Sequence, residues 1–377
     1  MGRPLRAVVI GAAHVHILEV CKYVNDCEEM ELAGVADVAP ADAPDLECDG
    51  PYTRRWNLEF VRRYGANVYD DYQDMLEQVR PDLALITTEN CMHVEVAHAC
   101  IERGVSVCVE KPMACDLAGA RKVARLARER GVEVFVNWPI AWREWLYRMK
   151  DVLDSGRMGP LIKVRYLAGQ TGPLGPGALH RGTDGKKAEE MAPAQKSRTW
   201  WYQKDHGGGA FLDMCCYGSM MSVWLTGSEC QAVSAMCGNF AHDWSDVEDN
   251  GIMLLRFPKS VAVVEGTWTT PAAAIAPGPE IFCRGGVIAC ERRGAQVAVY
   301  LTDLYGNVEY LPDIAPDPAL RNIACAFAAY RLHGREMPPI TRLENNLRSM
   351  AILEAGLRSV RSGKTELVDN AVWGNMG

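Results

Sequence analysis

Short runs of apolar residues alternate with amphipathic stretches over roughly the first 138 positions of the chain. The apolar runs predict strands at residues 5–11, 30–37, 82–88, 105–111 and 132–138. The stretches between them predict helices at residues 16–24, 58–65, 72–79, 93–104 and 116–131. Strands that are apolar throughout are typical of a parallel sheet covered by helices on both faces. The alternation therefore predicts a doubly wound, Rossmann-type α/β domain, which binds ligands at the carboxyl ends of its strands.

A different pattern begins after Trp138. The predicted elements are, in order, a helix at 143–156, a strand at 161–169, a polar loop rich in glycine and proline at about 171–198, an apolar helix at 207–227, strands from about 230 to 312, and helices near 318–333 and 344–362. Successive strands separated by Gly, Asn and Pro turns are typical of a mostly antiparallel sheet, and loops as long as the polar one are usually functional or mobile. We predict two domains, residues 1–138 and an α+β domain at 139–377 with a large, open sheet.

Composition and charge argue against several classes of function. The net charge is −8 over 377 residues, which argues against a nucleic-acid partner because phosphate binding needs a basic surface. No run of 18 apolar residues is present, so no membrane span is expected. The first predicted strand begins so early that no room for a signal peptide is expected, and the 14 cysteines are irregularly spaced without a C-x-x-C pair. We therefore expect a cytoplasmic protein with reduced, mostly buried thiols.

The first predicted strand runs into AVVIGAAHVHILEV at residues 7–20, where a dinucleotide-binding domain carries G-x-G-x-x-G. Gly11 takes the first glycine position and allows the tight turn. Ala13 takes the second and is small enough for a pyrophosphate to approach, whereas His16 takes the third. Amides at the helix start form an anion site, to which His14 adds a donor. We expect His14 to face the cofactor and His16 to displace the helix or point away; a plain strand-to-helix turn is the alternative.

Asp37 supports the nucleotide-binding interpretation. It ends the second predicted strand, 26 residues after Gly11, where a carboxylate accepts hydrogen bonds from the adenosine ribose. It would repel a 2′-phosphate, and no arginine or lysine follows within the next several residues, which favours NAD over NADP. A solvated strand-end carboxylate is the alternative. The H-x-H of His14 and His16 could suggest a metal, but the sequence places no third ligand near it, so no metal site is predicted.

Lys111 follows another buried strand, in CVEKPMACD, at the edge of the sheet where a nicotinamide would lie. A lysine at such an edge can donate or accept a proton, and Pro112 fixes the backbone where the strand ends. A surface lysine is the alternative interpretation.

The stretches that contain these residues resemble the Gfo/Idh/MocA oxidoreductase family. The family has a Thr-x-Asn-x-x-His stretch and then a strand ending in Glu-Lys-Pro, here Thr88, Asn90, His93 and residues 110–112, and the resemblance continues in GGGAFLDMCCYG and in the last predicted helix. It implies a Rossmann domain with an open-sheet second domain, and NAD(P)-dependent oxidation or reduction of sugars, cyclitols and related polyols. It also implies that Thr88, Asn90, His93 and Glu110 bind the cofactor together with Lys111, that Lys111 is catalytic, and that the protein is a homodimer or homotetramer.

The glycine-led helix carries Asp-x-x-x-His in this family. Asp213 matches the aspartate, whereas Tyr217 stands at the histidine position, as in members that resemble glucose–fructose oxidoreductase. Their i, i+4 spacing places both side chains on one helix face. The tyrosine would serve as a base if a cationic Lys111 favours its phenolate, while Asp213 would orient the substrate or the lysine. A packing aromatic and a helix-turn carboxylate are the alternatives, and the neighbouring Cys215 and Cys216 are expected to pack.

Further substrate contacts are predicted where the second domain begins and before the glycine-led helix. The candidates are Asn137, Trp138, Arg143 and Trp200, with Trp201 and His206 as additional residues near the cleft. Aromatic faces suit the C–H surfaces of sugars, although core packing is an equal alternative for each tryptophan.

The main hypothesis is an NAD-dependent oxidoreductase that transfers hydride between a hydroxyl of a sugar, glycoside or cyclitol and the nicotinamide. One alternative is an NAD-dependent glycoside hydrolase that oxidises its sugar transiently. Another is a regulator that binds NAD or a sugar without chemistry, against which Lys111 argues.

Overall fold

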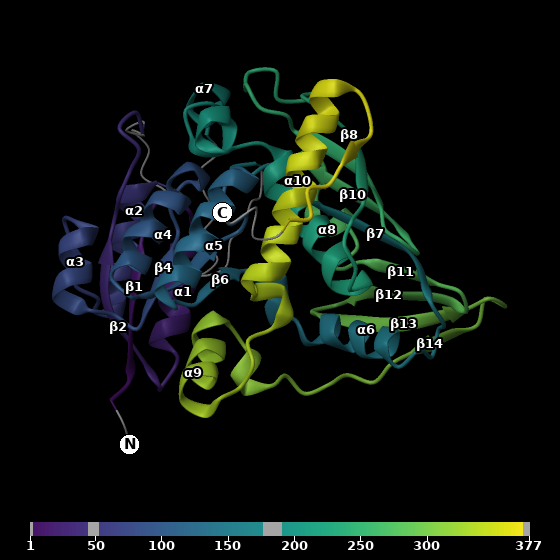
Figure 1. The fold of residues 1–377 in the computed structure, drawn as a ribbon, viewed down its shortest axis with the longest axis horizontal. Coiled ribbons are helices and arrows are strands. Elements are labelled where there is room, and N and C mark those ends of the chain that lie inside the picture. The colour runs from purple at the N-terminus through teal and green to yellow at the C-terminus, as the bar shows by residue number, and fades with distance from the viewer. Residues whose placement is uncertain (1–2, 44–52, 176–190, 372–377) are drawn as a thin grey trace.

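The computed structural model describes residues 3–43, 53–175 and 191–371, which form two sheets with helices between and around them (Figure 1). The N-terminal elements are β1 (Leu5–Ile10), α1 (His16–Asn25), β2 (Met30–Ala36), α2 (Arg54–Val61), β3 (Val68–Tyr69), α3 (Tyr72–Val79), β4 (Leu83–Ile86), α4 (His93–Glu102), β5 (Ser106–Glu110), α5 (Leu117–Arg130) and β6 (Val134–Asn137). Their strands pair in the order β3-β2-β1-β4-β5-β6, and every pair is parallel. The predicted doubly wound sheet is confirmed.

Local sequence explains where these elements begin and end. The strands β4, β5 and β6 are buried at every position, as their apolar runs predict. Asp71 and Asp116 cap α3 and α5 by accepting hydrogen bonds from the first free amides of each helix. The strand order reverses between β1 and β4, so the carboxyl ends of these two strands flank the position where such sheets bind ligands.

The second sheet has nine strands. The C-terminal elements are α6 (Glu144–Asp154), β7 (Leu161–Gly169), α7 (Pro193–Lys196), α8 (Ala210–Thr226), β8 (Ala232–Gly238), β9 (Asn250–Arg256), β10 (Val261–Thr267), β11 (Glu280–Cys283), β12 (Gly286–Arg293), β13 (Gln296–Asp303), β14 (Val308–Tyr310), α9 (Ile323–His333), α10 (Leu343–Ser362) and β15 (Glu366–Leu367). Their order is β14-β13-β12-β11-β7-β10-β9-β8-β15. Only β7 and β10 pair in parallel, which confirms a mostly antiparallel sheet.

The helices α8 and α10 lie between the two sheets (Figure 1). Along β9 the residues alternate between buried and exposed, and the buried ones face these helices. Gly218 lets α8 approach β10 closely, because a Cβ at this position would lie 2.9 Å from Cγ2 of Val264. This packing fixes α8, and with it Asp213 and Tyr217, against the second sheet.

The last two helices contact the N-terminal elements. The helix α9 packs against α1, and α10 packs against α5 and β6. Arg342 also forms a backbone bridge to Phe135 on β6. The last two helices therefore pack on the N-terminal elements, and α10 also packs on β8 of the second sheet. The domain boundary at residue 138 stays a prediction.

Two predicted helix starts differ from the structure. The helix predicted at 58–65 begins at Arg54, because the Thr53 side chain accepts a hydrogen bond from the Trp56 amide and caps it. The helix predicted near 318–333 begins only at Ile323, because the Asn322 side chain caps it there. Most of the polar loop predicted at 171–198, namely residues 176–190, lies outside the described residues.

Candidate active site

Gly11 makes the tight turn that the sequence predicts. Its φ is +101°, and a Cβ at this position would lie 2.6 Å from the Thr88 amide nitrogen, so a larger residue does not fit. The next amide, that of Ala12, donates to Asp37 Oδ1 at 2.7 Å. Asp37 therefore lies beside the loop, with one of its oxygens already engaged by the loop itself.

The following residues close this loop onto the rest of the chain. The His14 amide donates to the Thr87 carbonyl at 3.1 Å, and the His16 amide donates to His14 Nδ1 at 3.1 Å. The Trp200 indole donates to the Ala13 carbonyl at 3.4 Å, and its ring centre lies 5.7 Å from that of His14. The anion site expected from the amides of this helix start is therefore partly occupied by contacts within the chain.

The His16 ring, which the sequence predicts to displace the helix or to point away from the strand, extends toward Glu110 at the end of β5. Its Nδ1 lies 3.0 Å from Glu110 Oε2, and Asn137 Nδ2 donates to Glu110 Oε1 at 2.6 Å. Burial alone lowers the pKa of His16, but the Glu110 carboxylate outweighs burial and raises this pKa above its ordinary value. His16 is the first residue of α1, and helical side chains lean toward the N-terminus of their helix. The imidazole therefore extends over the carboxyl edge of the sheet.

His14, His16 and Glu110 each bring a possible ligand atom within 4.8 Å of the others. The structure thus supplies a third group near the H-x-H that the sequence did not place there. The His16 imidazole and the Asn137 amide already occupy the two oxygens of Glu110. We describe the cluster as a hydrogen-bonded ion pair, and the absence of a bound metal stays a prediction.

Lys111 reaches across from β5 to α8. Its Nζ donates to Asp213 Oδ1 and, at 3.0 Å, to the Asp213 carbonyl. The Trp268 indole donates to the other carboxylate oxygen of Asp213 at 2.9 Å. Tyr217, one helical turn further along α8, presents its ring with the Lys111 Nζ at 5.0 Å from the ring centre. The three residues predicted as catalytic are therefore neighbours, with Trp268 as a fourth that the sequence did not indicate.

Burial and neighbouring charges together set the charge states at this corner. Burial alone lowers the pKa of Lys111, but the Asp213 carboxylate outweighs burial and raises it, so the lysine is firmly cationic. Burial raises the pKa of Tyr217, and Lys111 offsets only part of this effect. Lys111 favours the phenolate, as expected, but burial outweighs this effect on the pKa, so the phenol is the favoured form in this structure.

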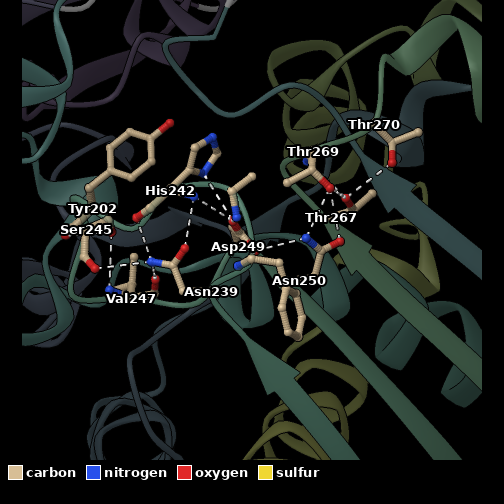
Figure 2. Close-up of polar contacts among 12 residues, drawn as sticks. Tyr202, Asn239, His242, Ser245, Val247, Asp249, Asn250, Thr267, Thr269 and Thr270 are labelled. Carbon is tan, nitrogen blue, oxygen red and sulfur yellow. Dashed lines mark hydrogen bonds and ion pairs between the residues drawn. The ribbon is translucent and has the colours of Figure 1, made fainter.

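The loop between β8 and β9 is held by hydrogen bonds to Asn239 and Asp249 (Figure 2). Buried Asp249 accepts hydrogen bonds from three successive backbone amides, those of residues 240–242, at 2.7–3.0 Å. Asn239 Nδ2 donates to three carbonyls of the same loop, at 2.7–3.1 Å. The Trp268 amide donates to the Asp249 carbonyl at 2.8 Å, and the Trp268 ring packs edge-on against Tyr202 at 5.1 Å. The loop thus fixes the indole that orients Asp213.

A cavity of about 320 Å³ lies where these groups meet. Its walls include His14, His16, Lys111, Tyr166, Trp201, Asp213, Tyr217 and Arg292. Of these, His16, Tyr166 and Arg292 were not predicted as binding residues, because they come from α1, β7 and β12, which only the fold brings together.

Some predicted substrate residues lie outside this cavity. Trp138 is 1% exposed, donates to Asn346 Oδ1 at 2.9 Å, and packs edge-on against Tyr217 at 5.3 Å. Asn137 supports Glu110, and Trp200 lies over the Gly11 loop. Packing and positioning, the alternative raised for the tryptophans, describe these residues better than substrate contact. Arg143 lines a neighbouring cavity, and His206 Nε2 lies 3.1 Å from Asp42 Oδ1.

The residues that follow β4 lie behind the cavity and hold the loops around it. His93 is fully buried, and its Nδ1 lies 3.0 Å from the Pro112 carbonyl. Burial lowers the pKa of His93 to about 4. Asn90 Nδ2 donates to the Gly207 carbonyl at 2.8 Å, and Thr88 packs under Gly11. These contacts are structural, and their assignment to cofactor binding stays a prediction.

Arg54 lies beside Asp37, which the sequence argument for NAD did not foresee. Its Nη1 donates to Asp37 Oδ1 at 2.5 Å and to the Val38 carbonyl at 2.9 Å. Its Nη2 donates to Glu89 at the end of β4. Arg54 follows Asp37 by 17 positions, and the packing of α2 against α1 places it beside Asp37. Asp37 thus has a cationic neighbour although none follows it closely in the sequence.

Other predictions concern the chain as a whole. All 13 cysteines among the described residues are free thiols, and Cys215 and Cys216 are buried, as expected for packing residues. Within the described ranges, no helix combines the length and the apolar character that crossing a membrane requires.

Two family models match this chain. One, described as an oxidoreductase family with an NAD-binding Rossmann fold, matches residues 5–138, and the other, the GFO/IDH/MocA C-terminal domain, matches residues 146–289. Together they cover more than half of the 377 residues.

Curated relatives and solved structures agree with these models. The chain is 27% identical over 213 residues to dTDP-3,4-didehydro-2,6-dideoxy-alpha-D-glucose 3-reductase of Actinomadura kijaniata, which covers 54% of this chain and 57% of the relative. It is 32% identical over 159 residues to D-glucoside 3-dehydrogenase of Escherichia coli (strain K12), covering 42% of this chain and 41% of the relative. The chain therefore matches about half the length of these relatives. The structure of aldose-aldose oxidoreductase from Caulobacter crescentus, complexed with glycerol, has a TM-score of 0.74 at 20% identity and covers 97% of this chain and 100% of its own, which shows the shared fold.

Proposed function

The chain belongs to the Gfo/Idh/MocA family of oxidoreductases, and we propose that it is an NAD-dependent enzyme that transfers hydride between a hydroxyl of a sugar, glycoside or cyclitol and the nicotinamide. The observation that carries the proposal is the meeting of Lys111, Asp213 and Tyr217 in one cavity at the carboxyl end of β5. The names of the relatives, a sugar 3-reductase and a glucoside 3-dehydrogenase, support this substrate class.

The described residues around the cleft fit a nicotinamide dinucleotide. The Asp37 carboxylate lies beside the Gly11 turn, where the hydroxyls of an adenosine ribose need hydrogen-bond acceptors. Glu89 Oε2 and Asn90 Oδ1 are buried acceptors without a hydrogen-bond partner among the described residues, and hydroxyl groups are donors that would satisfy them. When bound, the dinucleotide supplies the carbon that accepts or returns hydride. We assign Asp37 and Glu89 to its adenosine ribose and the Lys111 edge to its nicotinamide.

The charge states of the pocket suggest separate tasks for Lys111 and Tyr217. Because Asp213 keeps Lys111 cationic, the ammonium would donate a hydrogen bond to the reacting oxygen and stabilise negative charge there. Because burial favours the neutral phenol of Tyr217, the phenol would give its proton to that oxygen during reduction, leaving a phenolate beside cationic Lys111, and this phenolate would take the hydroxyl proton in the reverse, oxidative reaction. Asp213, fixed by Trp268, positions the lysine. The rings of Tyr166 and Trp201 offer apolar surface to sugar C–H groups.

Asp37 also supports a preference for NAD over NADP, because its carboxylate would repel a 2′-phosphate. Arg54 weakens this argument, since its guanidinium neutralises part of that charge. We propose that NAD remains preferred, because Arg54 is shared between Asp37 and Glu89 and so is not free to bind a phosphate.

The direct test mixes the protein with NAD and a panel of sugars, glycosides and cyclitols, and follows NADH absorbance. NADH should form with at least one class, and Lys111→Met should abolish this signal. Lys163→Met is the matched control, because that lysine stacks on Phe282 in the second sheet, outside the cavity lining. Aglycone release without net NADH would favour the glycoside hydrolase instead. NAD binding without turnover of any panel member would favour the regulator.

A homodimer or homotetramer and a cytoplasmic setting are also part of this proposal. The strands β8 and β9 expose neighbouring apolar side chains, with Met236 76% and Leu254 56% exposed, which supports association through this sheet. The free thiols support a reducing compartment. Light scattering after size exclusion would give the mass, and a monomer at micromolar concentration would contradict the oligomer.

A further inference from the structure

A second cavity, of about 530 Å³, adjoins the candidate active site. Pro277 and Arg292 line both cavities, so the two spaces are neighbours with Arg292 at their boundary. The second cavity lies where α6 packs beside β12 and β13 (Figure 1). Trp145, Val299 and Leu311 give it an apolar wall. A ligand held near Lys111 could therefore extend past Arg292 into this space.

Three arginines line the second cavity: Arg143, Arg148 and Arg292. Among the residues that the structure describes, none of the three forms an ion pair with a carboxylate, unlike most other arginines of the chain. The Arg148 Nε is buried without a hydrogen-bond partner there. The Arg292 guanidinium donates to the Ile275 carbonyl, which fixes it between the two cavities. A buried donor without an acceptor is costly, so the Arg148 Nε, with two further arginines at the same cavity, points to a ligand that supplies acceptors.

The start of α6 adds to the positive potential of this cavity. Arg143 is the N-cap of this 11-residue helix and makes no side-chain capping bond, and Glu144 and Trp145 of the first turn line the cavity. Free amides and the helix dipole favour an anion at such a position. Two exposed carboxylates, those of Glu144 and Asp313, also line the cavity, but the three arginines outnumber them, and of the three only Arg292 is exposed.

We propose that the second cavity binds a phosphoryl group carried by the sugar substrate, with Arg148 and Arg292 as its main ligands and the start of α6 as a third contact. An arginine guanidinium can donate two parallel hydrogen bonds to the oxygens of one phosphate. A neutral sugar offers no pair of charged oxygens for such a contact. The proposal rests on the function proposed above and narrows its substrate class to phosphorylated sugars or nucleotide sugars. Arg143, predicted from the sequence as a substrate residue, would act here and not at the reacting carbon.

The first experiment tests the anion site without requiring turnover. Calorimetric titration with inorganic pyrophosphate should show binding that weakens with added salt, as charge pairing predicts. Arg148→Gln and Arg292→Gln should each weaken it about tenfold, since each removes a charge and its hydrogen bonds to the anion. Arg293→Gln is the matched control, because this neighbour of Arg292 pairs with Glu291 and stacks on Tyr310 instead of lining the cavity. A titration in the presence of saturating NAD controls for pyrophosphate bound in the cofactor cleft.

The second experiment asks whether the anion belongs to the substrate. For one sugar measured with and without a phosphate or nucleoside diphosphate, KM should be lower for the phosphorylated form, and Arg292→Gln should raise KM for that form alone. Thermal melts of each variant confirm that it is folded.

Pyrophosphate binding that is absent, or unchanged in an Arg148→Gln/Arg292→Gln double variant, overturns the site. Binding at these arginines without a KM advantage assigns them to a free anion and overturns the substrate proposal. Arginine-dependent binding with no turnover of any sugar leaves the anion site intact and contradicts only the dehydrogenase.

Discussion

The two ends of the proposed cofactor cleft each hold a cation against acidic groups, but they draw on different lengths of the chain. At the adenosine end, Arg54 contacts Asp37 and Glu89, and all three come from the first 89 residues. At the catalytic end, Lys111 contacts Asp213, which lies 102 positions further on and belongs to the helix that supports the second sheet. The first end is completed within the Rossmann domain, and the second exists only when both halves of the chain are folded.

The two cations also differ in their surroundings. The Arg54 side chain is 22% exposed and shared between two carboxylates, whereas the Lys111 side chain is 4% exposed and has one. A charge pair is weakened more by solvent when it is exposed. The two ion pairs should therefore respond unequally to substitution, with the larger effects at the catalytic end.

Lys111→Met should have the largest effect of any single substitution. Turnover should fall at least about 10³-fold, because the removed charge stabilises the reacting oxygen. Stability should fall by about 3 kcal/mol, because the buried Asp213 carboxylate loses its partner. Adding Asp213→Asn should restore much of this stability, since both partners of the pair are then gone, but no turnover. Steady-state kinetics and urea unfolding measure the two quantities. Wild-type turnover in Lys111→Met would show that Lys111 does not stabilise the reacting oxygen.

Tyr217→Phe should rank second. Loss of the phenol that exchanges the proton should lower kcat about 10²–10⁴-fold, the usual contribution of general acid–base catalysis. KM should change little, because the ring and its packing against Trp138 remain. The pH dependence of kcat in the NADH-forming direction distinguishes this role from packing: kcat should rise with pH as the phenol loses its proton, and this rise should vanish in the variant. Unchanged kcat would leave Lys111 as the proton-transfer group and reduce Tyr217 to a wall of the cavity.

The catalytic end also contains two histidines whose titrations should act in opposite directions. Burial lowers the pKa of His93 from 6.5 to about 4, so its contribution to stability is present above pH 6.5 and is lost as the pH falls toward 4, by roughly 3 kcal/mol in all. The pKa of His16 is raised against Glu110, so its contribution is present below pH 6.5 and is lost as the pH rises through the raised pKa.

Urea unfolding between pH 4.5 and 8 separates these two effects, with about pH 6.5 as the reference value for histidine. His93→Asn should flatten the loss of stability on the acid side, and His16→Gln should flatten the loss on the neutral-to-alkaline side. Curves for both variants that run parallel to the wild-type curve would show that neither histidine is linked to folding, contrary to their burial.

Sequence patterns predicted the parts of this molecule that local rules determine. Apolar runs located the strands of the parallel sheet, and motif spacing located Lys111 and Asp213 despite their distance along the chain. Three features depended on packing that no local pattern encodes. Arg54 meets Asp37 only because α2 packs on α1, and Trp268 meets Asp213 because β10 lies beneath α8. His16 was recognised as unusual, but its direction follows from the lean of the first side chain of α1 over the sheet edge.

The smallest predicted effect concerns the adenosine end, where Asp37 and Arg54 should shift cofactor choice in opposite directions. Asp37→Ser should weaken NAD binding and relieve the exclusion of NADP, because it removes both a ribose acceptor and a charge that repels a 2′-phosphate. Arg54→Ala should sharpen the preference for NAD, because it leaves the Asp37 charge without its cationic neighbour. Each shift in the ratio of NAD to NADP affinity should be about tenfold, the size of one partly exposed charge contact. Fluorescence titration of both cofactors measures it, and Lys22→Ala, at an exposed pair on the same domain, is the control. If Arg54→Ala instead favours NADP, the arginine does not act through Asp37, and the two ends of the cleft are less alike than their ion pairs suggest.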